Sequence, residues 1–360
     1  MEKEEEALRR LFADCTLCPR SCHVNRLAGQ TGYCGQGAQV RAARAALHYW
    51  EEPCISGKAG SGAVFFSGCT LRCVFCQNRG IAAGRAGKEI SGERLAEIFL
   101  ELQEKGANNI NLVTATHFVP AIVPALEAAK RDGLRIPVVY NTSSYEKVST
   151  LKLLDGLVDI YLPDFKYVSG ELSAWLSGAP DYFETAAAAV EEMVRQVGEP
   201  LFEAADGRLV TAEQMNDACT DEAGDAPDSE FLMKKGVIVR HLALPGQEED
   251  SRRVLRYLLK TFGNRIYISL MNQYTPMPDF VRDVREAEEA GKNAGLDDRK
   301  GQDREAGKRR ALLGLTEKLS DEAYERLIGF AIDEGIENGF IQDGETARES
   351  FIPAFDGEGL

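Results

Sequence analysis

Three cysteines, Cys69, Cys73 and Cys76, are separated by three and then two residues in the printed sequence. At this spacing their thiolates can converge on one face of a small inorganic cluster. A [4Fe–4S] cluster normally takes four cysteine ligands, so three would leave one iron open to bind another molecule. The same cysteines also allow a zinc site completed by a distant ligand, or buried cysteines without metal. We interpret these loop cysteines (Cys69, Cys73 and Cys76) as ligands of a [4Fe–4S] cluster.

A second group lies near the N-terminus and is called here the N-terminal cysteines (Cys15, Cys18, Cys22 and Cys34). Four thiolates in a short, loop-rich segment suit structural zinc and equally a second iron–sulfur cluster. A second cluster could relay electrons to the first. Nine cysteines in a reducing compartment favour metal ligation over disulfides.

Strands and helices alternate after the loop cysteines. Apolar runs predict strands, and the helical spacing of apolar residues predicts helices between them. This alternation predicts parallel βαβ units, arranged either as a partial barrel or as a doubly wound sheet. The predicted strands are Ala63–Ser67, Ile110–Thr114, Pro137–Asn141, Val158–Leu162, Gly236–Leu242 and Arg265–Leu270. The predicted helices are one capped by Ser91 and closed by Gly106, then Val119–Asp132, Glu146–Leu154, Tyr182–Val197, Glu249–Thr261 and Asp321–Glu334.

Two charged stretches interrupt this alternation, at residues 203–230 and 279–310. Few large apolar residues occur in either, so both are expected to be loops or surface insertions. The resulting domains are a Cys-rich segment (1–58), a core barrel (59–278, with an acidic insertion at 203–230), a charged insertion (279–315), and a C-terminal helix and tail (316–360).

The composition narrows the class of protein. The chain has 360 residues, 44% of them hydrophobic, and a net charge of −15. An acidic surface repels nucleic acid and anionic membranes, so we expect neither as a partner. No apolar run is long enough to span a bilayer and no signal peptide is evident, which predicts a cytoplasmic protein.

The motif around the loop cysteines resembles that of the radical S-adenosylmethionine (SAM) superfamily. Within this superfamily, two segments are similar to the pyruvate formate-lyase activating enzyme: residues 162–166 (LPDFK) and 240–246 (RHLALPG). The segments Leu17–Cys22 and Gly32–Gly35 are similar to less characterised homologues of that enzyme. The resemblance covers roughly residues 60–278. It implies an α/β fold, a partial (β/α)6 TIM-type barrel with an N-terminal Cys-rich extension. SAM would bind the open iron at the carboxyl ends of the strands.

Polar residues at those strand ends are the candidate SAM contacts, because barrel active sites are built there. The activating enzymes carry Gly-Gly-Glu after the second strand to hold the SAM ammonium, whereas this chain has Val113–His117 and no carboxylate in that turn. His117, Ser144, Gln273 and Tyr274 are weaker candidates for contacts to SAM or substrate. The cofactor-binding candidates are Thr114, Thr116, Asn141, Ser143, Asp164, Lys166 and Arg240.

The resemblance implies an oxidoreductase that reductively cleaves SAM to a 5′-deoxyadenosyl radical. The radical would abstract hydrogen from a substrate, and a glycyl residue of a glycyl radical enzyme is the implied target. An electron donor such as flavodoxin or ferredoxin is the implied partner. The alternatives are modification of another peptide or of a small molecule, and a non-catalytic iron–sulfur or zinc protein.

Overall fold

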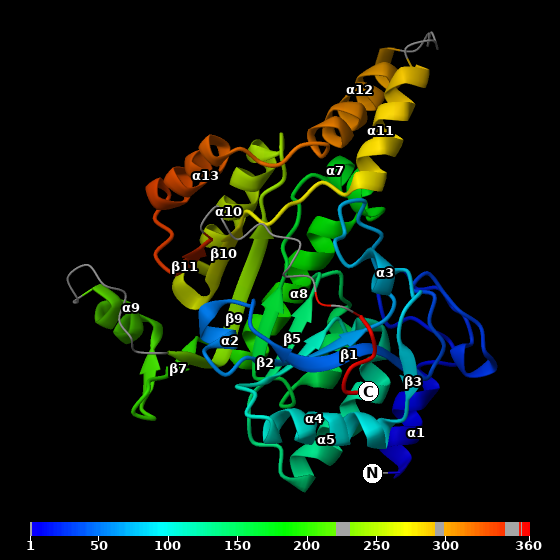
Figure 1. Cartoon of the computed structure of the whole chain (residues 1–360), viewed down its shortest axis with the longest axis vertical. Coiled ribbons are helices and arrows are strands. Elements are labelled where there is room, and N and C mark those ends of the chain that lie inside the picture. Colours follow the sequence, from blue (N-terminus) through cyan, green and yellow to red (C-terminus); the bar gives the residue numbers. More distant parts are fainter. Residues whose placement is uncertain (1, 221–230, 292–298, 343–352, 354) are drawn as a thin grey trace.

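A sheet with a parallel core forms the centre of the molecule (Figure 1). The runs of Val, Ile, Leu and Phe in these strands are buried on both faces, as parallel strands under helices require. The computed structural model of the chain describes residues 2–220, 231–291, 299–342, 353 and 355–360. The parallel strands are β2 (Ser61–Phe66), β4 (Ile110–Val113), β5 (Val138–Thr142), β6 (Ile160–Pro163), β9 (Leu232–Leu242) and β10 (Tyr267–Met271), and each overlaps a predicted strand.

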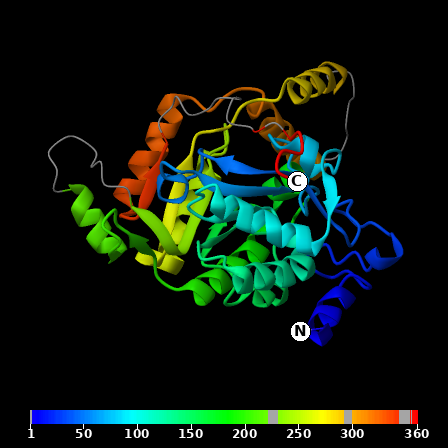
Figure 2. The ribbon, with the colours of Figure 1, turned by 60° about the horizontal axis from the view of Figure 1, so that its bottom comes forward.

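These strands lie in the sheet in the same order as in the chain, β2-β4-β5-β6-β9-β10. In a doubly wound sheet the strand order reverses at one point, and the described strands of this core contain no reversal. Right-handed crossovers therefore place the connecting helices on one side of the sheet (Figure 2). The predicted partial (β/α)6 barrel is confirmed, and the doubly wound alternative is excluded.

The connecting helices follow the predicted apolar periodicity. The Ser91 hydroxyl accepts the Arg94 N–H at 3.1 Å and caps the first of them, as predicted. The predicted helix over 146–154 is instead a short α6 followed by a 3₁₀ turn, Lys152–Leu154. The helices are α4 (Gly92–Glu104), α5 (Val119–Asp132), α6 (Val148–Leu151), α8 (Tyr182–Val197) and α10 (Glu248–Phe262).

The N-terminal segment joins the barrel through a strand. After α1 (Glu2–Arg10) and a 3₁₀ turn (Arg26–Ala28), β1 (Val40–His48) pairs antiparallel with β2 and with β3 (Lys88–Ile90). A short helix, α2 (Pro53–Ser56), connects β1 to β2, and α3 (Arg79–Ala82) lies between β2 and β3. The C-terminal residues run beside β1: the Ala45 N–H donates to the Glu358 carbonyl at 2.9 Å, and the Gly357 N–H to the Ala43 carbonyl at 3.0 Å.

The acidic stretch 203–230 was expected to be a loop or a surface insertion, and its described part has regular secondary structure instead of a loop. β7 (Leu201–Glu203), β8 (Leu209–Thr211) and α9 (Ala212–Thr220) extend into it, and β7 pairs antiparallel with the start of β9. Phe202 is fully buried and packs in one cluster with Val210 and Met215, so a few apolar residues anchor this charged segment. Residues 221–230 lie outside the described part of the chain.

The charged stretch 279–310 was also expected to be a loop or a surface insertion, and its described residues form helices instead of a loop. α11 (Pro278–Gly291) and α12 (Arg299–Gly314) project from the barrel side by side (Figure 1). An Arg309–Glu288 ion pair joins them, and Gly307 packs on the Trp175 ring of α7 (Gly170–Ser177). Glu, Lys, Arg and Ala are strong helix formers, so a polar sequence with ion pairs can be helical without a wide apolar face.

The last helix confirms its prediction. The Ser320 hydroxyl accepts the Ala323 N–H at 3.2 Å and caps α13 (Asp321–Asp333). The short β11 (Gly339–Ile341) then adds to β10 as a parallel edge strand. Within the described residues, no helix combines the length and apolar character that crossing a membrane requires.

Candidate functional site

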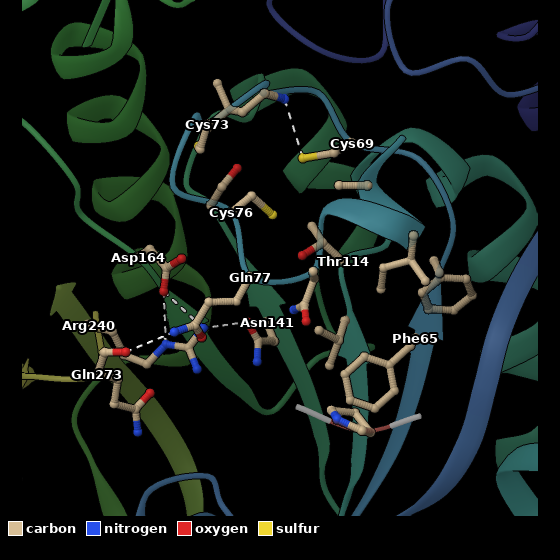
Figure 3. A pocket seen from close by; sticks show the side chains of 18 of the residues that line it. Phe65, Cys69, Cys73, Cys76, Gln77, Thr114, Asn141, Asp164, Arg240 and Gln273 are labelled. Atoms are coloured by element: carbon tan, nitrogen blue, oxygen red, sulfur yellow. Dashed lines mark hydrogen bonds and ion pairs between the residues drawn. The ribbon is translucent and has the colours of Figure 1, made fainter. Parts of the chain in front are cut away.

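The loop cysteines follow β2 and lie at the end of the barrel where the parallel strands terminate (Figure 3). Burial raises the pKa of Cys69 to about 12, and the neighbouring Cys73 and Cys76 thiolates add to this effect. Burial and Cys73 likewise raise the pKa of Cys76 to about 11. The three sulfurs are therefore close enough to influence one another. Without a metal they are protonated at neutral pH, so binding a cluster must release protons.

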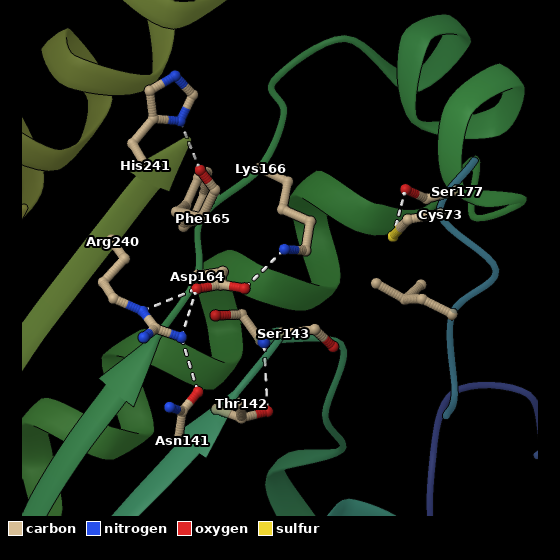
Figure 4. A network of polar contacts seen from close by, with 12 residues as sticks. Cys73, Asn141, Thr142, Ser143, Asp164, Phe165, Lys166, Ser177, Arg240 and His241 are labelled. Carbon is tan, nitrogen blue, oxygen red and sulfur yellow. Dashed lines mark hydrogen bonds and ion pairs between the residues drawn. The ribbon is translucent and has the colours of Figure 1, made fainter. Parts of the chain in front are cut away.

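The C-terminal end of α7 holds this loop in place. The Val74 N–H donates to the Leu176 carbonyl at 2.8 Å, and the Arg72 N–H to the Ser177 carbonyl at 3.4 Å. The Ser177 hydroxyl also donates to the Cys73 sulfur at 3.0 Å (Figure 4). Hydrogen bonds to ligand sulfurs stabilise the thiolate and tune the potential of an iron–sulfur cluster. Ser177 is therefore placed to adjust the site.

A cavity of about 280 Å³ adjoins the loop cysteines (Figure 3). Small-molecule sites are concave and combine apolar walls with a few placed polar groups. Phe65, Phe66 and Leu71 supply apolar wall here. The polar and sulfur wall contains the predicted residues Cys69, Cys73, Cys76, Thr114, Asn141, Ser143, Asp164, Lys166, Arg240 and Gln273.

A network of charged side chains crosses the cavity wall (Figure 4). Lys166 Nζ donates to Asp164 Oδ2 at 2.6 Å, and Arg240 Nε donates to Asp164 Oδ1 at 2.9 Å. Arg240 also donates to Asn141 Oδ1 at 2.7 Å and to Glu51 Oε2 at 3.0 Å. The carboxyl ends of three neighbouring strands, β5, β6 and β9, supply Asn141, Asp164 and Arg240, because parallel strands end at one edge.

In this network, burial disfavours the charged forms of the side chains, whereas ion pairing favours them. Burial disfavours the charged form of Asp164, but Lys166 and Arg240 outweigh it and lower the Asp164 pKa. Burial also opposes the charge of Lys166, and Asp164 outweighs it and raises the Lys166 pKa. Burial raises the pKa of Glu51 in spite of Arg240. The ion pair of Asp164 and Lys166 is thus fixed in its charged form beside the cysteines.

A comparison with protein families finds a match to the part of the chain that contains the loop cysteines. The model described as the radical SAM superfamily matches residues 63–198, from β2 to the end of α8, including the loop cysteines. This segment is therefore similar to the radical SAM superfamily. The superfamily implies a [4Fe–4S] cluster and SAM as cofactors. The match does not separate the activating enzymes from other members, so glycyl radical activation remains a proposal.

Other similar proteins add little about activity. The chain is 30% identical over 191 residues to the uncharacterised protein MJ0674 of Methanocaldococcus jannaschii, an alignment covering 51% of this chain and 54% of that one. Streptococcus suis SuiB bound to the precursor peptide SuiA has 12% identity, a TM-score of 0.40, and coverage of 76% of this chain and 46% of SuiB. The hydrogenase maturase HydG of Carboxydothermus hydrogenoformans has 14% identity, a TM-score of 0.39, and coverage of 81% and 60%. Both TM-scores are below 0.5.

The residues of the cavity fit the two implied cofactors. Soft thiolates are the ligands that iron–sulfur clusters take, and three of them line the wall. Ser143 Oγ lines the same cavity, is buried, and has no hydrogen-bond partner among the described residues, so it can contact a bound polar molecule. In the described part of the chain, no set of three or more His, Cys, Asp or Glu side chains is placed to hold a single metal ion. The cysteines of a cubane bind different irons and therefore need not meet at one point.

Glu51 is a cavity residue that the sequence did not indicate. It follows β1, outside the matched segment, and its Oε1 accepts from Asn111 at 3.1 Å and Asn141 at 3.3 Å. A carboxylate is therefore present in the cavity although the turn after β4 has none. The only local signal was an acidic pair, Glu51-Glu52, before Pro53. Local patterns do not reveal that β1 lies beside β2 and brings this pair to the barrel mouth.

Thr114 and Thr116 are separated by the structure. Thr114 lines the cavity, whereas Thr116 is buried away from it and donates to Glu146 Oε1 at 2.5 Å. Thr142 donates to the same oxygen at 2.5 Å and Tyr140 at 3.4 Å. Burial raises the Glu146 pKa to about 7 against these hydroxyls. Thr116 thus belongs to a buried carboxyl site behind the cavity wall.

The weaker candidates have different positions. His117 is buried, and its Nε2 lies 2.7 Å from the Ser67 carbonyl; burial lowers its pKa to about 3, so it is neutral. Ser144 is fully buried with a left-handed φ of 62°. Tyr274 donates to the Leu315 carbonyl. These three are absent from the described cavity wall, whereas Gln273 lies on it and accepts from Gln77 Nε2 through its carbonyl at 2.8 Å.

Proposed function

We propose that this protein reductively cleaves SAM at a [4Fe–4S] cluster held by the loop cysteines, and that the 5′-deoxyadenosyl radical abstracts hydrogen from a substrate. The observation that carries the proposal is one cavity with three cysteines on its wall and a buried network of fixed charges beside them. When bound, the cluster supplies an electron to the SAM sulfonium through its open iron.

The charged residues bind and orient SAM in this proposal. Lys166 lies beside Cys73, where its ammonium can attract the SAM carboxylate. Asp164 and Asn141 offer oxygens to the SAM amino group or ribose, and Arg240 fixes both of them. Because the network is formed before SAM arrives, little reorganisation is needed on binding. Ser143 adds an unused hydroxyl for the ribose.

A glycyl residue of a partner enzyme is the proposed hydrogen donor, and flavodoxin or ferredoxin is the proposed electron donor. Both come from the likeness of the segments at 162–166 and 240–246 to the activating enzymes. Modification of another peptide or of a small molecule is the outcome to test against this target.

The test is anaerobic reconstitution of the full chain with iron and sulfide, followed by dithionite and SAM. Release of 5′-deoxyadenosine and methionine supports the proposal, and a protein that contains the cluster but releases neither overturns it. A Cys54→Ala variant is the matched control, because Cys54 is a buried cysteine of α2 outside the cavity wall. A stable glycyl radical in electron paramagnetic resonance (EPR) spectra, on an added glycyl radical enzyme, would identify the target.

A further inference from the structure

We propose that the N-terminal cysteines bind a second [4Fe–4S] cluster, and that this cluster passes electrons to the one at the loop cysteines. The metal site does not depend on the proposed function. The electron transfer also rests on the proposed function of the loop cysteines.

Backbone contacts bring the segments that carry the four N-terminal cysteines together. The His23 N–H, next to Cys22, donates to the Cys15 carbonyl at 3.0 Å, and the Ser21 N–H donates to the Cys18 carbonyl at 3.0 Å. The Tyr33 N–H, next to Cys34, donates to Cys22 Sγ at 3.2 Å. The loop therefore folds back so that a neighbour of one cysteine contacts another cysteine.

Hydrogen-bond donors already point at these sulfurs. The Tyr33 N–H donates to Cys22 Sγ at 3.2 Å, and Gly32 packs against the same side chain, where a Cβ would lie 2.8 Å from the sulfur. Backbone N–H groups of Arg20 and Gln36 favour the thiolate forms of Cys18 and Cys34. N–H···S bonds of this kind support metal-bound thiolates.

A buried cation beside Cys15 supports the metal site independently of the cysteines themselves. Arg26 is 2% exposed, stacks on the Phe12 ring at 4.5 Å, and donates to the carbonyls of Gly37 and His117. It also lies 5.5 Å from the centre of the Phe118 ring and donates to Cys15 Sγ at 3.8 Å, and no described carboxylate pairs with it. A buried guanidinium requires a compensating negative charge. Four thiolates around a cluster carry a net negative charge and would provide it.

The spacing favours iron–sulfur over zinc. Structural zinc sites are commonly built from two Cys pairs, each closely spaced. Here three cysteines lie within eight positions and the fourth follows after eleven residues, which is closer to the runs that bind [4Fe–4S] clusters.

The N-terminal segment also packs directly on the loop of the first cluster. A Cβ at Gly68 would lie 2.7 Å from the Cys34 carbonyl oxygen, so the two backbones touch. Arg20 Nε donates to the Thr70 carbonyl at 2.9 Å, and the guanidinium groups of Arg20 and Arg72 lie over the Tyr33 ring at 4.0 and 4.1 Å. This packing holds the two groups of cysteines in neighbouring segments, as an electron relay between two clusters requires.

The transfer is a one-electron step without bond changes. The N-terminal cluster is oxidised from [4Fe–4S]⁺ to [4Fe–4S]²⁺, and the cluster at the loop cysteines is reduced from [4Fe–4S]²⁺ to [4Fe–4S]⁺. An external one-electron donor of low potential, dithionite or a reduced flavodoxin, returns the first cluster to its reduced form.

The test compares three full-length variants with wild type, all prepared anaerobically: Cys15→Ser with Cys22→Ser, Cys69→Ser with Cys73→Ser and Cys76→Ser, and Cys54→Ser as control. Iron, sulfide and zinc are measured per chain, with EPR of the dithionite-reduced protein. Wild type and control are expected to contain twice the iron and sulfide of the other two variants. Their EPR spectra should show two interacting clusters, and each of the other variants a single cluster.

Wild-type iron equal to that of the N-terminal variant, or stoichiometric zinc lost in that variant, would overturn the proposal. If the N-terminal variant does not fold, the loop variant still tests the proposal, because it is expected to keep half of the iron that wild type contains. A loop variant that keeps all of the iron would instead overturn the proposed function. For the transfer, the N-terminal variant should lose flavodoxin-driven 5′-deoxyadenosine release and keep dithionite-driven release; unchanged flavodoxin-driven release contradicts the relay.

Discussion

The two groups of cysteines differ in what surrounds them. The loop cysteines line a cavity that also contains Asp164, Lys166 and Arg240, so their side of the barrel is equipped to receive a polar molecule. The N-terminal cysteines are absent from that wall. Cys15 and Cys18 are buried, with Arg26 beside Cys15, whereas Cys22 and Cys34 are half-buried. Three ligands with an adjoining cavity suit chemistry at an open iron, whereas four ligands in a packed segment suit a closed metal site.

The sharpest test of this difference removes one loop cysteine. Cys73→Ala should reduce 5′-deoxyadenosine release by more than the roughly 100-fold expected for loss of an outer-shell partner, because a direct ligand is lost. Anaerobic turnover with dithionite measures this, with Cys54→Ala as control. Turnover within tenfold of wild type would contradict the assignment of Cys73 as a cluster ligand.

The second test breaks the charge network that only the loop site possesses. Arg240→Ala leaves Glu51 and Asp164 without their shared cation, and removing one partner of a buried pair costs about 3–5 kcal/mol. Urea unfolding of the metal-free protein measures the loss. Arg256→Ala is the control, since its pair with Glu334 is half-exposed and should be worth about 1 kcal/mol or less. Equal losses in the two variants would mean that the network contributes no more than a surface ion pair.

The third test concerns Glu146, which lies behind the cavity wall and influences Cys18. Its pKa is raised from 4.5 to about 7 by burial, so the folded state binds a proton more tightly than the unfolded state. The contribution of Glu146 to the free energy of unfolding is therefore fully present below pH 4.5. It falls by about 3 kcal/mol in total as the pH rises toward 7. Glu146→Gln keeps an acceptor for the three hydroxyls and removes this titration.

The measurement is urea unfolding of wild type and Glu146→Gln between pH 5 and pH 8. The stability of the variant relative to wild type should rise with pH over this range, because titrations common to both proteins cancel. A difference that is constant with pH would show that Glu146 is already ionised in the folded protein.

The smallest expected effect comes from the hydrogen bond of Ser177 to Cys73. A hydrogen bond to a charged group is worth about 1.5–3 kcal/mol, and losing it disfavours the reduced cluster, which carries more negative charge on its sulfurs. Ser177→Ala should therefore shift the potential of the loop cluster to a more negative value. Ser173→Ala is the control on the same helix, where the hydroxyl bonds only the Gly170 carbonyl at 3.1 Å. Redox titration by EPR measures both, and equal potentials would contradict the role of Ser177.

Much of the barrel could be predicted because its signals are local. Val119–Asp132 and Tyr182–Val197 are helices with the predicted bounds, since apolar periodicity marks their extent and a glycine follows the C-terminal end of each. The charged helices α11 and α12 were not predicted, because the contacts that support them are not local. Gly307 of α12 packs on Trp175 of α7, and Arg309 of α12 pairs with Glu288 of α11. Thr116 shares a strand end with Thr114, but the local backbone turns it toward Glu146.

The sequence by itself determined the cysteine spacing and the positions where the strands end. Those features follow from residues a few positions apart, and parallel pairing then brings Asn141, Asp164 and Arg240 to one edge. Only the tertiary structure decided that Glu51 completes the charge network and that Arg26 is buried against Cys15. Such contacts join elements far apart in the chain, and packing of the whole molecule selects them, so no local pattern records them.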